Sequence, residues 1–170
     1  MVKYKKNTKP TTKPTATAKS VTKPDAKQEQ NFLSPKLLEQ ARAEFALKQI
    51  QAAIDRTEQG GYKHSQVKSF SRRFPSMVQT NGFGQAVAFF YAKRNDYPAY
   101  GVIYQLVEDW LCQSEKVYAE FANAQSPKLL NAITQSDQRT YRQATAETQA
   151  LMIWVKKFAE GLILKDEEAD

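Results

Sequence analysis

The stretch Met77-Val78-Gln79-Thr80-Asn81-Gly82-Phe83-Gly84-Gln85-Ala86-Val87-Ala88-Phe89-Phe90-Tyr91 decides the fold class of this chain. Its Asn81-Gly82 pair is a strong signal for a β-hairpin turn, which would place a strand on each side. The flanking segments lack the alternation of a half-buried strand and suit a buried helix instead. We therefore predict helix from Ser76 to Lys93, in which Gly82 and Gly84 allow a neighbouring helix to approach closely. That packing would offset a cost of about 1 kcal/mol for each glycine relative to Ala.

Outside this stretch, helical spacing of apolar residues recurs, and no segment sustains the two-residue alternation of strands. The expected helices cover about residues 35–58, 62–74, 76–93, 99–114, 127–134 and 138–164. Expected boundary residues are Ser34-Pro35 and Gly60-Gly61 for the first helix, Pro75 between the second and third, and Ser126 and Asp137 as N-caps of the last two. We therefore predict an all-α fold, a compact single-domain bundle of about five to seven helices with a disordered N-terminal tail.

Composition divides the chain into three parts. Residues 1–30 form a Lys/Thr/Pro-rich tail with almost nothing apolar to bury, and they are expected to be disordered. Residues 31–164 form the helical domain, and residues 165–170 are expected to be an acidic, frayed C-terminus. A lysine-rich tail attracts polyanions without reading their sequence. The alternative is a solubilising tail that has no specific partner.

Most of the positive charge lies in this tail. The full chain has 25 Lys and Arg residues against 18 Asp and Glu residues. Residues 1–30 contain eight lysines and two acids, so residues 31–170 contain 17 basic and 16 acidic side chains. A basic surface on the helical domain must therefore be argued from local clusters and not from the net charge.

Few residues are available for catalysis. His64 is the only histidine and Cys112 the only cysteine, which excludes a histidine triad, a multi-histidine or cysteine-cluster metal site and an internal disulfide. Cys112 lies in an apolar stretch, so we expect a buried thiol in a reducing, cytoplasmic compartment. There is no phosphate-loop or dinucleotide motif, and no apolar run reaches membrane-spanning length. We expect no enzymatic activity, no metal and no cofactor.

A basic face is predicted on the helix expected at residues 62–74. One row consists of His64, Lys68 and Arg72, the neighbouring row consists of Ser65, Ser69 and Arg73, and Lys63 flanks both. Side chains four residues apart share one side of a helix, and the apolar residues lie on the other side. Because few acids are near in the sequence, we predict a solvent-facing surface whose hydroxyls and cations bind phosphates. The alternative is an ordinary solvated face.

Other candidates are less specific. Lys93-Arg94 follows the helix expected at 76–93, where the pair would bind phosphate or simply interact with the helix dipole. Lys156-Lys157 lies among apolar residues, and snorkelling at the rim of the core is the favoured interpretation. The tyrosines that could stack on bases are Tyr62, Tyr91, Tyr97, Tyr100 and Tyr104, although core-edge positions are simpler for most of them. The predicted nucleic-acid-binding residues are Lys63, His64, Lys68, Arg72, Arg73, Lys93 and Arg94.

Two segments resemble the signatures of a known family. The first runs from Phe74-Pro75 through Asn81-Gly82-Phe83-Gly84-Gln85-Ala86 to Phe89-Phe90, and the second contains Tyr141, Thr145, Glu147 and Trp154-Val155-Lys156-Lys157-Phe158-Ala159. Their order and spacing resemble the small subunit of the Cmr complex, a type III-B CRISPR assembly. The resemblance covers about residues 41–164. Phe83 stands where Leu is usual, and the N-terminal tail is not part of the family pattern.

This resemblance implies a compact helical subunit without catalytic residues. In that family, copies stack into a minor filament beside the backbone subunits that hold the guide RNA, along the groove where guide and target RNA pair. The implied partners are the large subunit, the backbone subunits, copies of this chain, and the guide and target RNAs, acting in antiviral defence. Two alternatives remain: a free-standing helical protein that binds nucleic acid through its basic tail, and the equivalent small subunit of a type III-A complex.

Overall fold

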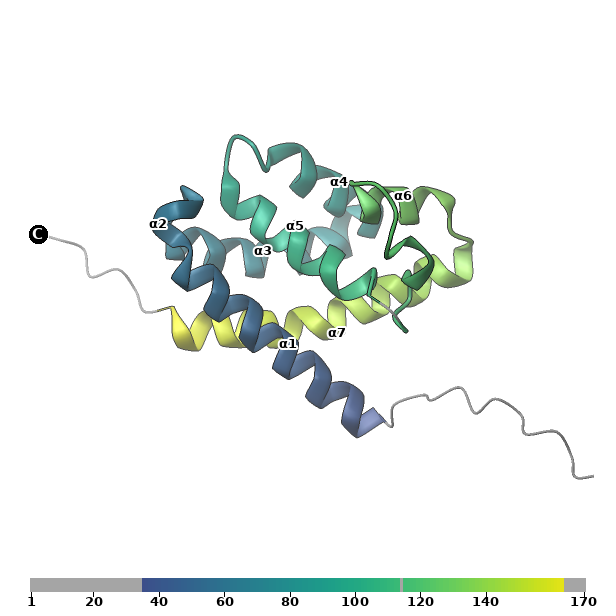
Figure 1. The fold of residues 1–170 in the computed structure, drawn as a ribbon, viewed down its shortest axis with the longest axis horizontal. Helices are drawn as coiled ribbons and strands as arrows, with labels where there is room; N and C mark the ends of the chain where they lie inside the picture. The colour runs from purple at the N-terminus through teal and green to yellow at the C-terminus, as the bar shows by residue number, and fades with distance from the viewer. Residues whose placement is uncertain (1–34, 114, 164–170) are drawn as a thin grey trace, which may run out of the picture. The chain divides into compact units, whose positions relative to one another are not determined.

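The computed structural model describes residues 35–113 and 115–163, in which every regular element is a helix (Figure 1). The elements with eight or more residues are α1 (Pro35–Asp55), α3 (His64–Asn81), α4 (Phe83–Lys93), α5 (Pro98–Leu111), α6 (Lys128–Gln135) and α7 (Gln138–Leu162). Short connections contain α2 (Thr57–Gly60) and a 3-10 turn at Ala119–Phe121. The predicted all-α class is confirmed. The predictions for residues 1–30, for residues 165–170 and for a cap at Ser34 lie outside the described residues.

The boundary between α3 and α4 differs from the sequence prediction. Helix α3 continues through Pro75, and the break falls at Gly82, whose φ of 87° is a conformation that favours glycine. A proline inside a helix costs about 3 kcal/mol. The buried stripe of α3 explains why the helix continues, because Phe74 and Val78 lie on either side of Pro75 and are both in the core. The break predicted at Pro75 is therefore wrong.

The two glycines of the motif have different roles. The amide of Gly84 donates a hydrogen bond to the Tyr141 hydroxyl at 2.9 Å, and an added Cβ would lie 3.4 Å from Ile133. Gly84 therefore permits the close helix approach that the sequence predicts. An added Cβ on Gly82 would meet nothing within 4 Å, so this glycine serves the backbone turn and the prediction of close packing at Gly82 is wrong.

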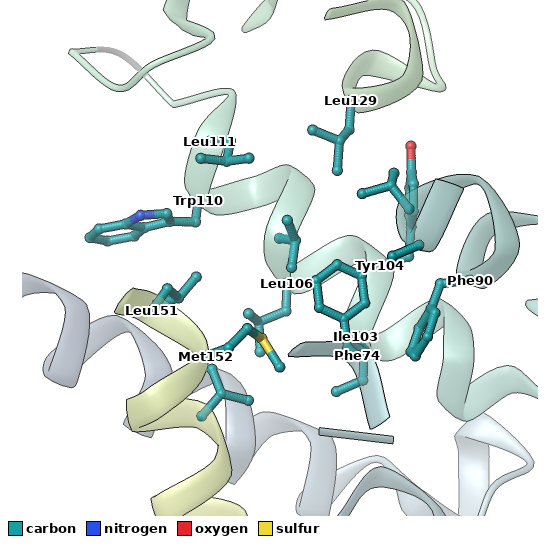
Figure 2. Packing of buried hydrophobic residues seen from close by; sticks show 14 of the residues in the cluster. Phe74, Phe90, Ile103, Tyr104, Leu106, Trp110, Leu111, Leu129, Leu151 and Met152 are labelled. Atoms are coloured by element: carbon teal, nitrogen blue, oxygen red, sulfur yellow. The ribbon is translucent and has the colours of Figure 1, made fainter. Parts of the chain in front are cut away.

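Helix α5 supplies much of the core. Its predicted inward residues are buried, and they are Ile103, Leu106, Val107, Trp110 and Leu111. Figure 2 shows side chains from α3, α4, α6 and α7 gathered around it, among them Phe74, Phe90, Leu129 and Met152. Truncating a buried aromatic residue of this kind to Ala typically costs about 3–5 kcal/mol. The packing around α5 thus fixes the mutual positions of the other helices.

Helix α7 packs against both α1 and α3, and α1 crosses it (Figure 1). The Asp137 carboxylate accepts a hydrogen bond from the Thr140 amide at 2.7 Å, which confirms the predicted N-cap. Leu151 and Val155 are buried as expected, whereas Leu162 is 43% exposed. The apolar stripe of α7 therefore lines the core until its last turn.

The start of α6 is capped from a distance. Ser126 makes no side-chain cap, because the helix begins after Pro127. Instead, the carboxylate of Glu108 on α5 accepts hydrogen bonds from the Leu129 amide at 2.9 Å and from the Tyr104 hydroxyl at 2.7 Å. A buried charge needs such partners, so the predicted Ser126 cap is wrong and a buried glutamate replaces it.

Candidate nucleic-acid interface

The predicted basic stripe of α3 divides into two parts, and the first part turns toward other helices. The Lys68 ammonium donates to the Ile163 carbonyl at the end of α7 at 2.6 Å. Arg72 forms an ion pair with Glu160 at 2.9 Å. The ring of His64 lies 3.2 Å from the Ile54 carbonyl on α1. These side chains hold α3 against its neighbours, and Arg72 is paired by an acid that is distant in the sequence, where the prediction considered only the few acids nearby.

The second part gathers around Tyr100 at the start of α5. Arg73 is exposed, donates to the Tyr100 hydroxyl at 2.8 Å and lies 5.4 Å from the centre of the Phe89 ring. Tyr97 is 50% exposed, and its ring centre is 6.1 Å from that of Tyr100. A fixed guanidinium beside an exposed aromatic ring suits a phosphate and a base together.

We call these three residues the Tyr100 cluster (Arg73, Tyr97 and Tyr100), and two of the remaining predicted cations flank it. Lys93 pairs with Asp96 at 3.4 Å in the turn before α5. Arg94 lies 3.5 Å from the centre of the Tyr91 ring, and its Cβ would meet a Cβ added to Gly101. Lys63 is exposed at the start of α3. The structure therefore places Lys93 and Arg94 beside the first turn of α5, next to the Tyr100 cluster.

Tyr97 is the main addition to the predicted interface. The sequence offers it as one of five tyrosines that could stack on bases, most of which are more simply core-edge or interface residues, and the prediction does not distinguish Tyr97 from the others. The useful signal is its place directly before Pro98, which begins α5. A residue at the N-cap lies outside the helix, so its side chain is not bound to the core stripe.

A groove between α3 and α7 forms a separate feature of about 300 Å³. Its lining combines apolar and polar side chains, namely Pro75, Gln79, Gln149, Met152, Ile153, Lys156 and Lys157. Both lysines are exposed, and Lys157 lies 5.5 Å from the centre of the Trp154 ring. The snorkelling interpretation fits Lys157, whose ammonium lies over the Trp154 ring, better than Lys156.

A second hollow, of about 340 Å³, lies between α1, α5 and the connection that follows α5. It is lined by Phe45, Gln49, Glu108, Asp109, Cys112, Gln113, Ala122 and Lys128. Burial raises the pKa of Asp109, although a hydrogen bond from Gln105 at 2.7 Å opposes this rise. Burial also raises the pKa of Cys112 to about 12, so the predicted buried thiol is confirmed and the group is unreactive at neutral pH.

The residues of the two sequence signatures hold the fold together. The Gly84–Tyr141 hydrogen bond joins the first signature to the second. Glu147 accepts hydrogen bonds from Arg42 Nε on α1 and Trp110 Nε1 on α5, each at 2.9 Å. Burial alone would raise the pKa of Glu147, but these hydrogen bonds and the Arg42 charge outweigh it and hold the pKa below its ordinary value. The signature residues therefore stabilise the contacts between helices.

Within the part of the chain that the structure describes, no three His, Cys, Asp or Glu side chains are arranged to hold a metal ion. In the same residues, no helix combines the length and apolarity needed to cross a membrane. The fold and its surface define a small all-helical domain with a basic aromatic cluster and separate grooves. The family model described as CRISPR-associated protein (Cas_Cmr5) matches residues 38–162, and the chain belongs to this family. It is a small subunit of the Cmr (type III-B) CRISPR system.

Proposed function

We propose that this protein is a non-catalytic, RNA-gripping scaffold of the cytoplasmic Cmr ribonucleoprotein. Copies stack into a minor filament beside the backbone subunits and support the pairing of guide and target RNA in antiviral defence. Membership in this family supports the association of the protein with other Cmr subunits. The Tyr100 cluster is the observation that favours RNA as the ligand, because an exposed tyrosine and an anchored arginine both contact Tyr100.

The cluster suits a flexible single strand or the backbone of a paired one. Arg73 is held by Tyr100 and Phe89, so little side-chain freedom is lost when it meets a phosphate. Tyr97 offers a ring face that any base can use. Lys63 at the start of α3 extends the positive surface, and contacts of this kind do not read sequence.

The test is RNA retention by the reconstituted Cmr complex that contains Arg73→Gln or Tyr97→Ala. Arg73→Gln is expected to weaken RNA binding and to lower the slope of log K against log salt by about 1. Tyr97→Ala is expected to cost about 1–3 kcal/mol if a base stacks on the ring. Both positions are exposed, so the unfolding temperature of the subunit is expected to change little.

The matched control is Arg142→Gln, which removes an exposed arginine of α7 that makes no ion pair with another described residue. It is expected to leave RNA retention unchanged. Equal losses from Arg142→Gln and Arg73→Gln would indicate a general charge effect and contradict the Tyr100 cluster as the RNA contact. Normal retention by both Arg73→Gln and Tyr97→Ala would contradict it as well.

A further inference from the structure

The groove between α3 and α7 contains an exposed apolar side chain and an exposed cation that contribute no core packing or ion pair among the described residues. Ile153 is 56% exposed, although it lies well inside the ends of helix α7 along the chain. Lys156 lies almost one turn further along the same groove, is exposed, and makes no hydrogen bond or ion pair within residues 35–113 and 115–163. Ile153 shares the groove with Pro75 and Met152, so the groove combines an apolar floor with a cation beside it, as an interface with an apolar centre and a polar rim does.

The hollow between α1 and α5 presents a carboxylate instead. Phe45, Cys112 and Ala122 contribute apolar walls, and Asp109 contributes the carboxylate. Lys128 also lines the hollow, but its ammonium donates to the Ala122 carbonyl at 2.5 Å. Burial raises the pKa of Asp109, and the charges of Lys128 and Arg56 oppose this rise. Among the described residues, neither cation forms an ion pair with Asp109, whose carboxylate accepts a hydrogen bond from Gln105. An ionised carboxylate in a partly buried position is stabilised when a cation comes close to it. The hollow therefore fits an apolar side chain accompanied by an ammonium group.

We propose that these two surfaces bind each other between copies of this chain. Ile153 of one copy packs against the apolar wall formed by Phe45 and Ala122 of the next copy. Lys156 of the first copy then pairs with Asp109 of the second. The surfaces are complementary in charge, and each hollow is large enough for one side chain. This inference rests on the proposed stacking of copies and names the residues that make the contact.

The two surfaces also have the relation that a repeating assembly requires. One is built on α3 and α7, and the other on α1, α5 and residues 112–128, so they share no residue and no helix. Each copy can therefore use both surfaces at once. A contact between unlike surfaces repeats head to tail and forms an open filament unless the rotation closes a ring.

The test is a charge exchange, measured by sedimentation of the full-length chain over a wide concentration range. Wild-type protein is expected to self-associate more as its concentration rises. Lys156→Glu and Asp109→Lys are each expected to weaken self-association by about tenfold or more, because like charges then face each other. An equimolar mixture of the two variants is expected to associate again, since the glutamate introduced in one variant can face the lysine introduced in the other.

Two substitutions with the same charge changes serve as controls, Arg142→Glu and Glu120→Lys, because both residues are exposed and outside the two surfaces. They are expected to leave association unchanged. Ile153→Asp covers the case in which Asp109→Lys fails to fold, because Ile153 is exposed and its replacement leaves the core intact. This variant is expected to remain folded by circular dichroism and to stay monomeric.

Three results would overturn the proposed contact. The first is a wild-type chain that stays monomeric at every concentration. The second is self-association of Lys156→Glu and Ile153→Asp that equals that of wild type. The third is a mixture of folded Lys156→Glu and folded Asp109→Lys that does not associate. The copy number of this subunit in the purified Cmr complex separates this failure from that of the proposed function. Several stacked copies that tolerate these substitutions would reject only this contact, whereas a single copy would reject the stacking itself.

Discussion

At the scale of single residues, Glu147 joins three helices. Its side chain is only 13% exposed, and it accepts hydrogen bonds from Arg42 on α1 and Trp110 on α5. The second sequence signature contains Glu147, but nothing in the local pattern of α1 marks Arg42 as its partner. Pairings between residues 105 positions apart depend on how the helices cross. Periodicity predicts the helices and does not predict such crossings.

The Glu147→Gln variant tests this joint. At neutral pH, we expect its free energy of unfolding to be about 2–3 kcal/mol lower than that of wild type, because Arg42 loses its largely buried partner and, among the described residues, keeps only Glu39, whose side chain is half exposed. The folded-state pKa of Glu147 is depressed, so its stabilising effect is present above the ordinary pKa of 4.5 and is lost as the pH falls through the lower folded pKa. The difference between variant and wild type should therefore shrink on acidification.

Urea unfolding at a series of pH values measures this difference. The control is Glu44→Gln, which removes an exposed partner of Lys48 and should leave stability nearly unchanged at all pH values. A constant difference between Glu147→Gln and wild type down to strongly acidic pH would argue against a depressed pKa at Glu147.

At the scale of helices, the sequence predicts the existence of elements better than their ends. The choice of helix over hairpin at Asn81-Gly82 is confirmed, because the flanking residues carry helical spacing on both sides. The position of the break is wrong, since the rule that proline ends a helix competes here with the burial of Phe74 and Val78. Packing against α5 keeps α3 helical through Pro75, and the residues around Pro75 do not indicate this packing.

Two glycine substitutions test the break between α3 and α4. Gly82→Ala is expected to destabilise the protein by about 1–3 kcal/mol, because a Cβ is strained at a φ of 87°. Gly161→Ala is expected to stabilise it by about 0.4–1 kcal/mol, since Gly161 lies in α7 with open space around its Cβ position. Thermal unfolding measures both changes. Equal effects of the two substitutions would show that the turn at Gly82 does not depend on glycine.

At the scale of the whole molecule, most of the net positive charge and the helical fold lie in different parts of the chain. The helical fold and the family match concern residues 38–162, whereas residues 1–30 carry most of the net charge. Charge counting alone would therefore assign RNA binding to the tail. Of the predicted cations on the domain, Arg73, Lys93 and Arg94 lie on or near the Tyr100 cluster, and Lys63 is exposed at the start of α3. His64, Lys68 and Arg72 contact α1 or α7 because these helices end beside α3, which spacing along one helix cannot reveal.

Deletion of residues 1–30 separates the proposed subunit role from a free-standing nucleic-acid binder. We expect the truncated chain to enter the Cmr complex and the complex to retain guide RNA, because the Tyr100 cluster and both hollows remain. Affinity purification followed by RNA sequencing measures this outcome. Loss of all RNA from the truncated chain, together with normal folding, would favour binding through the lysine-rich tail.

The buried thiol of Cys112 makes this chain convenient for labelling experiments. Because its pKa is raised to about 12, the Cys112 thiol forms almost no thiolate at neutral pH. It is therefore not expected to react with maleimide reagents while the protein is folded. A fluorophore or spin label can therefore be attached to a cysteine introduced at an exposed position outside the proposed surfaces, such as Arg142, without first removing the native one. Distances between labelled subunits could then be measured inside the working assembly.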